Sequence, residues 1–123
     1  MSKHILLIED FPVIQHLYAD HLQRNGFEVD VAPDGKQALE LVQTKTYDFI
    51  LVDLLLPNVN GIEFLEQFTN RPPTTKVIVL SDFNEPHTVE KAHNLGIAAY
   101  LIKAENTPSE LLEKLNAMEA PAA

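Results

Sequence analysis

The chain has no cysteine among its 123 residues. It therefore has no disulfide framework and no thiolate metal site, which is typical of proteins in a reducing cytoplasm.

Basic residues are also few, because nine Lys and Arg stand against eighteen Asp and Glu and the formal net charge is -9. This charge argues against a nonspecific grip on nucleic acid or on an anionic membrane, and it suits proteins or cations as partners.

Long hydrophobic runs are absent as well. The apolar run nearest the N-terminus covers residues 5–8, which is too short for a secretory core or a membrane span. We therefore expect a soluble, cytoplasmic protein without a membrane partner. The length and a hydrophobic content of 46% predict one domain over residues 1–123, with a frayed tail of small residues at 119–123.

Short apolar runs recur along the chain at residues 5–8, 49–52, 77–80 and 97–102. Runs of this length without polar alternation are typical of strands buried on both faces. Residues 28–31 alternate between polar and apolar side chains, which predicts an edge strand.

Five amphipathic segments follow these strands and begin at Pro12, Asp34, Asn60, Pro86 and Thr107. Asp34, Asn60 and Thr107 are each followed three residues later by Glu or Gln, which is the capping-box pattern of a helix start. Strands that alternate with helices predict a three-layer α/β fold, in which a doubly wound parallel sheet of five strands carries helices on both faces.

Polar residues stand where the apolar strands end: Glu9 with Asp10, then Asp53, Ser81 and Lys103. In a parallel sheet all carboxyl ends lie along one edge, so these side chains should meet. Carboxylates about 5 Å apart repel one another by roughly 3 kcal/mol at an effective dielectric near 20, which calls for a cation. Oxygen ligands favour a hard ion such as Mg²⁺, and an added lysine and hydroxyl suit a carboxylate that receives a phosphoryl group.

The segment after Asp53 should be a loop of fixed shape. Pro57 cannot donate a ladder hydrogen bond, and Gly61 tolerates backbone angles that other residues avoid. Since such a loop at the end of a central parallel strand is where open α/β sheets place their chemistry, Asp53 is the first candidate for the reacting group.

With these residues in these positions, the chain resembles the response-regulator receiver family of two-component signalling over nearly its whole length. The likeness rests on the acidic pair, on Asp53 with its loop, and on Ser81, Tyr100 and Lys103. It implies a flavodoxin-like strand order 2-1-3-4-5 and Asp53 as the phosphoacceptor.

The resemblance also implies a ligand set and a switch. Mg²⁺ would be held by Asp10, by Asp53 and by the backbone carbonyl of Leu55, with Glu9 assisting through water. Lys103 would pair with the phosphoryl group and Ser81 would swing to bond it. Tyr100 would change rotamer and alter the face made by the fourth helix, the fifth strand and the fifth helix.

The partners follow from the same resemblance. A histidine kinase or a histidine phosphotransfer protein would donate the phosphoryl group, and a downstream effector that the sequence does not identify would receive the signal. Dimerisation on activation stays open. The chain would not be an enzyme in the ordinary sense, because it would catalyse only its own phosphotransfer and autodephosphorylation.

The sequence departs from the family pattern at three positions. Leu56 replaces a frequent methionine, which conserves volume. Asp82 stands where a small residue is usual, and an anion there is expected to slow phosphoryl transfer or attack by water. Ala104 follows Lys103 where proline is common, and without proline a cis bond costs about 2.5 to 4 kcal/mol.

Other interpretations of the same residues remain open. Asp10 and Asp53 are also common turn residues, Ser81 could cap the turn after its strand, Tyr100 could be packing, and Lys103 could be a solvated strand end.

Particular residues disfavour two other functions. A haloacid-dehalogenase-like phosphatase needs a second aspartate where Leu55 stands, and Glu9 with Asp10 would repel the phosphate of a flavodoxin-like redox protein. The second hypothesis is a receiver-shaped protein-binding module that acts without phosphorylation, which Asp82 and Ala104 keep open.

Overall fold

The structure is a computed structural model that describes residues 3–119. The strands are β1 (His4–Ile8), β2 (Glu28–Ala32), β3 (Phe49–Val52), β4 (Lys76–Ser81) and β5 (Ala99–Ile102). The helices are α1 (Pro12–Arg24), α2 (Gly35–Thr44), α3 (Gly61–Gln67), α4 (Pro86–Asn94) and α5 (Pro108–Glu119), and a short 3-10 helix, η1 (Lys103–Glu105), follows β5. All strand pairs are parallel and the order is β2-β1-β3-β4-β5, which confirms the predicted fold class.

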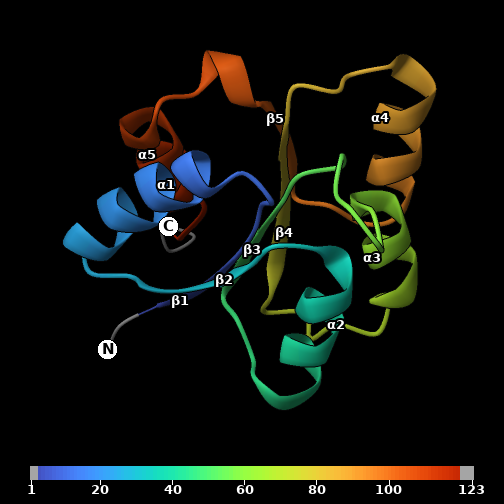
Figure 1. Cartoon of the computed structure of the whole chain (residues 1–123), viewed down its shortest axis with the longest axis horizontal. Helices are drawn as coiled ribbons and strands as arrows, with labels where there is room; N and C mark the ends of the chain where they lie inside the picture. Colours follow the sequence, from blue (N-terminus) through green and yellow to red (C-terminus); the bar gives the residue numbers. More distant parts are fainter. Residues whose placement is uncertain (1–2, 120–123) are drawn as a thin grey trace.

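The sheet lies between two helical layers. Helices α1 and α5 cover one face, and α2, α3 and α4 cover the other (Figure 1). Strand β1 shows why residues 5–8 are all apolar: Ile5 and Leu7 pack into the cluster under α1 and α5, while Leu6 and Ile8 pack into the opposite cluster. Successive strand residues point to opposite faces of the sheet. When helices cover both faces, every position along the strand is buried and apolar residues are favoured throughout.

The boundary of the fifth strand differs from the prediction. The ladder begins at Ala99 rather than at residue 97, opposite Ile78 of β4. Gly96 turns the chain at φ 85°, and Ile97 then buries its side chain in the core beneath α4 before the strand starts. Hydrophobicity alone does not distinguish such a core residue from a strand residue.

The loop after β3 has the expected fixed shape, but the reason given for Gly61 was wrong. The residue with positive φ is Asn58, at 63°, whereas Gly61 is not in that region. Gly61 is needed for close approach instead, because a Cβ there would lie 2.4 Å from the carbonyl oxygen of Asp53. Its N–H donates to the Leu54 carbonyl at 3.0 Å, so the loop folds back against the end of β3.

The predicted capping boxes are confirmed at α3 and α5, and at α2 only one of the two bonds of the box is present. Both reciprocal bonds form at the start of α3 and at the start of α5. At α2 the Asp34 side chain accepts from the Gln37 N–H with one oxygen and from the Asn58 amide with the other, but the Asp34 N–H does not donate to the Gln37 side chain, so the box is incomplete. The Asn58 amide and the Val59 carbonyl, which accepts from the Gly35 N–H, hold the loop after β3 against the start of α2.

The last helix extends further than predicted. The frayed tail was expected over residues 119–123, but Glu119 is helical, and residues 120–123 lie outside the described part of the chain. The carbonyl of Met118 accepts from the Lys76 ammonium, which holds the end of α5 against β4. Within residues 3–119, none of the helices has the length and apolarity needed to cross a membrane.

Candidate functional site

The carboxylate of Asp53 lies where three strands end. The backbone N–H of Asp53 donates to the carbonyl of Ile8 at 3.1 Å, which fixes the end of β3 against β1. One carboxylate oxygen accepts from the Ser81 hydroxyl at 2.7 Å, and the other accepts from the Lys103 ammonium at 2.6 Å. The residue is only 8% exposed. The convergence expected from the strand ends is therefore present, and it depends on the register that pairs β3 with both β1 and β4.

Lys103 is a largely buried cation that bridges two carboxylates. Its Nζ lies 2.5 Å from Glu9 Oε1 and 2.6 Å from Asp53 Oδ2, and its side chain is 15% exposed. Burial by itself lowers the pKa of this ammonium, but the bonds to Asp53 and Glu9 outweigh burial and raise the pKa above its ordinary value. This burial excludes the interpretation of Lys103 as a solvated strand end.

Glu9 and Asp10 complete an acidic group around Asp53. Each of the three residues offers a carboxylate oxygen, and these oxygens lie within 4.8 Å of one another. Glu9 is 3% exposed, and burial raises the pKa of its carboxyl despite the opposing bonds from Lys103 and from the Phe11 N–H. Asp10 is exposed, so the group has one member that faces water. An all-oxygen set of this kind fits Mg²⁺, which binds few protein ligands and keeps waters.

Ser81 combines two of the interpretations offered for it. Its side chain is fully buried and its hydroxyl donates to Asp53, as the site hypothesis requires. The same oxygen accepts from the Phe83 N–H at 3.2 Å, so it also caps the turn after β4. A hydroxyl can do both because it carries one donor and two acceptor lone pairs.

Leu55 and Tyr100 lie at the margins of this group. The Leu55 N–H donates to Asp53 at 3.2 Å and its side chain is 61% exposed, while the ligand role of its carbonyl stays a prediction. Tyr100 does not reach Asp53: its hydroxyl donates to the Phe83 carbonyl and its ring lies 6.4 Å from that of His93. Burial, and after it the charge of Asp53, raises the pKa of the Tyr100 hydroxyl. Its switching role also stays a prediction.

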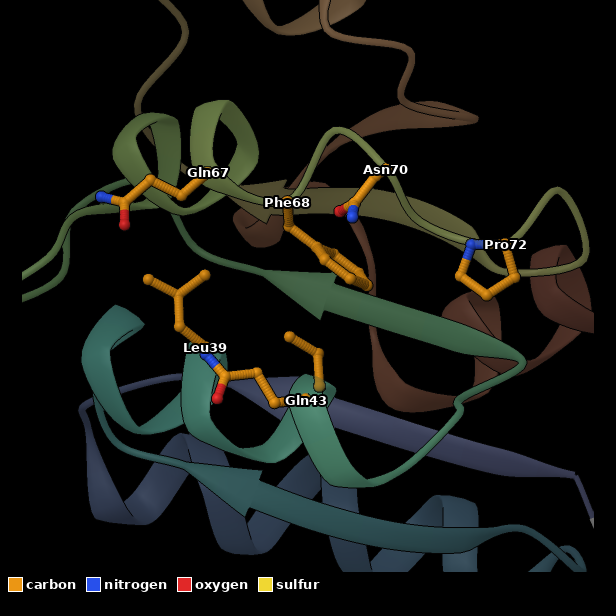
Figure 2. Close-up of a pocket in the computed structure, with 7 residues that line it drawn as sticks. Leu39, Gln43, Gln67, Phe68, Asn70 and Pro72 are labelled. Atoms are coloured by element: carbon orange, nitrogen blue, oxygen red, sulfur yellow. The ribbon is translucent and has the colours of Figure 1, made fainter.

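Two hollows of similar size differ in what they offer chemically. The one at the carboxyl edge of the sheet has a volume of about 400 Å³ and is lined by the acidic group, by Lys103 and by the side chains of Phe11 and Leu55. The other lies between α2 and the end of α3 (Figure 2), and its walls are apolar or amide side chains: Leu39, Gln43, Gln67, Phe68, Asn70 and Pro72. None of these wall residues is ionisable, so this second hollow lacks the carboxylates and the cation that line the first.

One contact of the site was missed in the sequence. Asp82 Oδ1 accepts from the Ala104 N–H at 2.7 Å and joins the loop after β4 to η1, which follows β5. A signal existed, because Asp82 follows Ser81 and Ala104 follows Lys103. If Ser81 and Lys103 reach the same carboxylate, their neighbours in the chain are close enough to bond as well.

The Lys103–Ala104 bond is trans, as are all peptide bonds in residues 3–119, and Lys103 nonetheless reaches the carboxylates.

Comparisons with known proteins agree with this geometry. The family model of the response regulator receiver domain matches residues 5–116. The chain is 33% identical over 118 residues to the response regulator ArlR of Staphylococcus saprophyticus, covering 96% of this chain and 52% of that protein. The chain thus spans about half the length of this curated relative.

Solved structures are similar over nearly the whole chain. A CheY-like receiver domain of Methanospirillum hungatei superposes with a TM-score of 0.90 at 27% identity, covering 96% of this chain and 94% of that one. The response regulator TrrA of Thermotoga maritima, in complex with Mg²⁺-BeF, gives a TM-score of 0.80 at 28% identity and covers 95% and 99%. Since the family model matches most of the sequence and the fold is the same, the chain belongs to the response regulator receiver domain family.

Proposed function

We propose that this chain is a phosphorylation-activated signalling switch in which Asp53 accepts a phosphoryl group from a phosphohistidine. The observation that carries the proposal is the pair of donors on one buried carboxylate: the Lys103 ammonium at 2.6 Å and the Ser81 hydroxyl at 2.7 Å. Both donors can move from the free carboxylate to the oxygens of an attached phosphoryl group. Charge-assisted hydrogen bonds of this kind hold a phosphoryl group and stabilise the charge that develops during its transfer.

The reaction is a displacement at phosphorus. A carboxylate oxygen of Asp53 forms the new P–O bond, the P–N bond to the donor imidazole breaks, and the imidazole leaves with the bonding electron pair and takes up a proton. Lys103 neutralises charge on the phosphoryl oxygens, and Ser81 donates to one of them. The chain acts only on itself, both in this transfer and in the later hydrolysis of the acyl phosphate.

Asp10, Asp53 and the Leu55 carbonyl are the groups that would hold Mg²⁺, with Glu9 assisting through water. The oxygen-only donor set and its spacing support this assignment, as does the Mg²⁺-BeF complex of the related TrrA. When bound, the ion supplies positive charge for the phosphoryl oxygens. Glu9 meanwhile keeps Lys103 in place, since one Glu9 oxygen is already bonded to that ammonium.

Phosphorylation would change the face made by α4, β5 and α5. Ser81 and Tyr100 are both bonded to Phe83, the first through its N–H and the second through its carbonyl. A shift of Ser81 toward the phosphoryl group would therefore move Phe83 and release Tyr100. Changing the populations from 1:99 to 99:1 takes about 5.5 kcal/mol, which a few hydrogen bonds to a charged group, at about 1.5 to 3 kcal/mol each, can supply.

The phosphodonor would be a histidine kinase or a histidine phosphotransfer protein. Phe11 and Leu55 border the hollow with 56% and 61% of their surfaces exposed, and Val13, two residues after Phe11, is 67% exposed. An apolar rim around an acidic hollow suits the docking of a protein that carries the phosphoryl group, whereas the net charge of -9 does not suit nucleic acid or an anionic membrane. A downstream effector and dimerisation after activation belong to the same proposal, as does a cytoplasmic location.

The test is the intact mass of the protein after incubation with a small phosphodonor and Mg²⁺. The wild type should gain one phosphoryl group, and Asp53→Asn should gain none. Asp48→Asn is the matched control, because Asp48 lies at the opposite edge of the sheet, and this variant should be phosphorylated like the wild type. A wild type that folds and binds Mg²⁺ but gains no phosphoryl group would favour a protein-binding module that works without phosphorylation.

A further inference from the structure

The segment Ser81–Phe83 connects the site to three other parts of the molecule. Ser81 donates to Asp53 at the end of β3, and Phe83 accepts from Tyr100 on β5. Between them, Asp82 accepts from the N–H of Ala104 in η1 at 2.7 Å. Three consecutive residues thus hold β3, β5 and η1, and only the middle connection has no part in the proposed function.

The Asp82 carboxylate gives the Ala104 N–H a hydrogen-bond acceptor. Ala104 lies in the first turn of η1, where N–H groups have no partner within the helix. The carboxylate of Asp82 supplies that partner from across the hollow, which both Asp82 and Lys103 line. Since Ala104 directly follows Lys103, whatever fixes the Ala104 backbone also fixes the point from which the Lys103 side chain extends.

We propose that Asp82 is a positioning residue, whose carboxylate holds the Ala104 backbone and thereby sets Lys103 over Asp53. The bond also joins the residue after Ser81, at the end of β4, to η1, which begins with Lys103, so the two proposed phosphoryl-binding groups are held as one unit. This inference rests on the proposed function, because it explains how the proposed phosphoacceptor keeps its cation.

Two effects of Asp82 oppose each other and can be separated by substitution. Its negative charge beside the hollow slows the approach of an anionic donor, whereas its hydrogen bond orders the cation that the transfer needs. Asp82→Asn removes the charge and keeps an oxygen that can accept from Ala104. Asp82→Ala removes both.

The experiment measures how much Lys103→Met slows phosphorylation of Asp53 by a small phosphodonor in three backgrounds. These are the wild type, Asp82→Asn and Asp82→Ala. Each slowing factor compares a protein that has Lys103 with its Lys103→Met variant. Both carry the same residue at position 82, so the effect of the Asp82 charge on the approach of the donor cancels. We expect the slowing factor to be about tenfold smaller with Asp82→Ala, because Lys103 is then already misplaced, and unchanged with Asp82→Asn. Equal factors in all three backgrounds, or equal reductions in both variants, would overturn the proposal.

A second measurement needs no phosphorylation. Hydrogen exchange of the Ala104 amide should be at least about tenfold faster with Asp82→Ala and unchanged with Asp82→Asn. If the wild type cannot be phosphorylated but exchange follows this pattern, the proposed function fails while the hydrogen bond stands. If the Ala104 amide exchanges equally fast in the wild type and in Asp82→Ala, the bond does not hold the loop and the positioning role is wrong.

Discussion

The two edges of the sheet carry the same pair of charged groups in different surroundings. At the amino edge, Lys3 lies 4.0 Å from Asp48, and the side chains are 53% and 37% exposed. At the carboxyl edge, Lys103 lies 2.6 Å from Asp53, and the side chains are 15% and 10% exposed. Water screens the first pair, so it contributes little, whereas the second pair interacts in a medium of low dielectric. The two pairs therefore differ in burial and distance, and not in the type of charge.

The difference has a cost at the carboxyl edge. Glu9 keeps a raised pKa because burial disfavours its charge, even though Lys103 is bonded to it. In the proposed function this burial would strengthen the interaction of Lys103 with a phosphoryl group, because less water would screen the two charges.

The largest expected effect is on phosphotransfer. Lys103→Met should slow phosphorylation of Asp53 by a small phosphodonor about 10²-fold, as expected when one preorganised donor to a developing charge is removed. Lys3→Met removes the lysine of the exposed pair and is the matched control. The rate is read from the time course of the phosphorylated mass. Similar rates for the two variants would break the comparison between the edges.

The next effect concerns the loop that shapes the site. Gly61→Ala should lower the free energy of unfolding by about 2 kcal/mol, because the new methyl group would overlap the Asp53 carbonyl oxygen, 2.4 Å away. Urea unfolding measures the change. Thr74→Ala alters an exposed residue before β4, at the amino edge, and should stay within about 0.5 kcal/mol of the wild type. A tolerated Gly61→Ala would mean that the loop can move away from β3.

A pH series tests Asp34, a carboxylate whose charged form is stabilised in the folded protein. The pKa of Asp34 is lowered, mainly because the Gln37 N–H donates to it and also because the Asn58 amide does. A lowered folded pKa means that this stabilisation is present above the ordinary value of 3.8 and is lost as the pH falls through the folded value.

Asp34→Ala should therefore destabilise the protein by about 1 kcal/mol near neutral pH, the usual cost of losing an N-cap. The difference from the wild type should shrink as urea unfolding is repeated at lower pH. A difference that does not vary with pH would assign the effect to packing instead of to the ionised cap.

The smallest effect is expected at the amino edge. Lys3→Met should change the free energy of unfolding by only about 0.3 kcal/mol, because the Lys3–Asp48 pair is long and exposed. Added salt should reduce even this difference. A loss above about 1 kcal/mol would show that the two edges differ less than their exposure indicates.

Much of the fold was predictable because it follows from local patterns. The wholly apolar segment at β3 and the capping residues of α3 and α5 stand where the sequence placed them. The meeting of Asp53, Ser81 and Lys103 was also predictable, since parallel strands end at one edge. Each of these inferences needs only residue type, spacing and the geometry of a parallel sheet.

Other features required contacts between distant segments. The close approach of Gly61 to β3 depends on how the loop folds back, and Asn58 rather than glycine takes the left-handed conformation. The bond between Asp82 and Ala104 joins the loop after β4 to η1, and neither residue suggests it alone. These contacts follow from the packing of loops against one another, for which a single sequence has no periodic signal.

The sequence by itself determined the order of strands and helices along the chain and which polar side chains stand at the strand ends, because hydrophobic periodicity and capping act over a few residues. Tertiary structure alone decided which of those side chains lose water, since burial depends on every layer around them. That loss separates Lys103, held between Glu9 and Asp53, from Lys3, which remains in solvent.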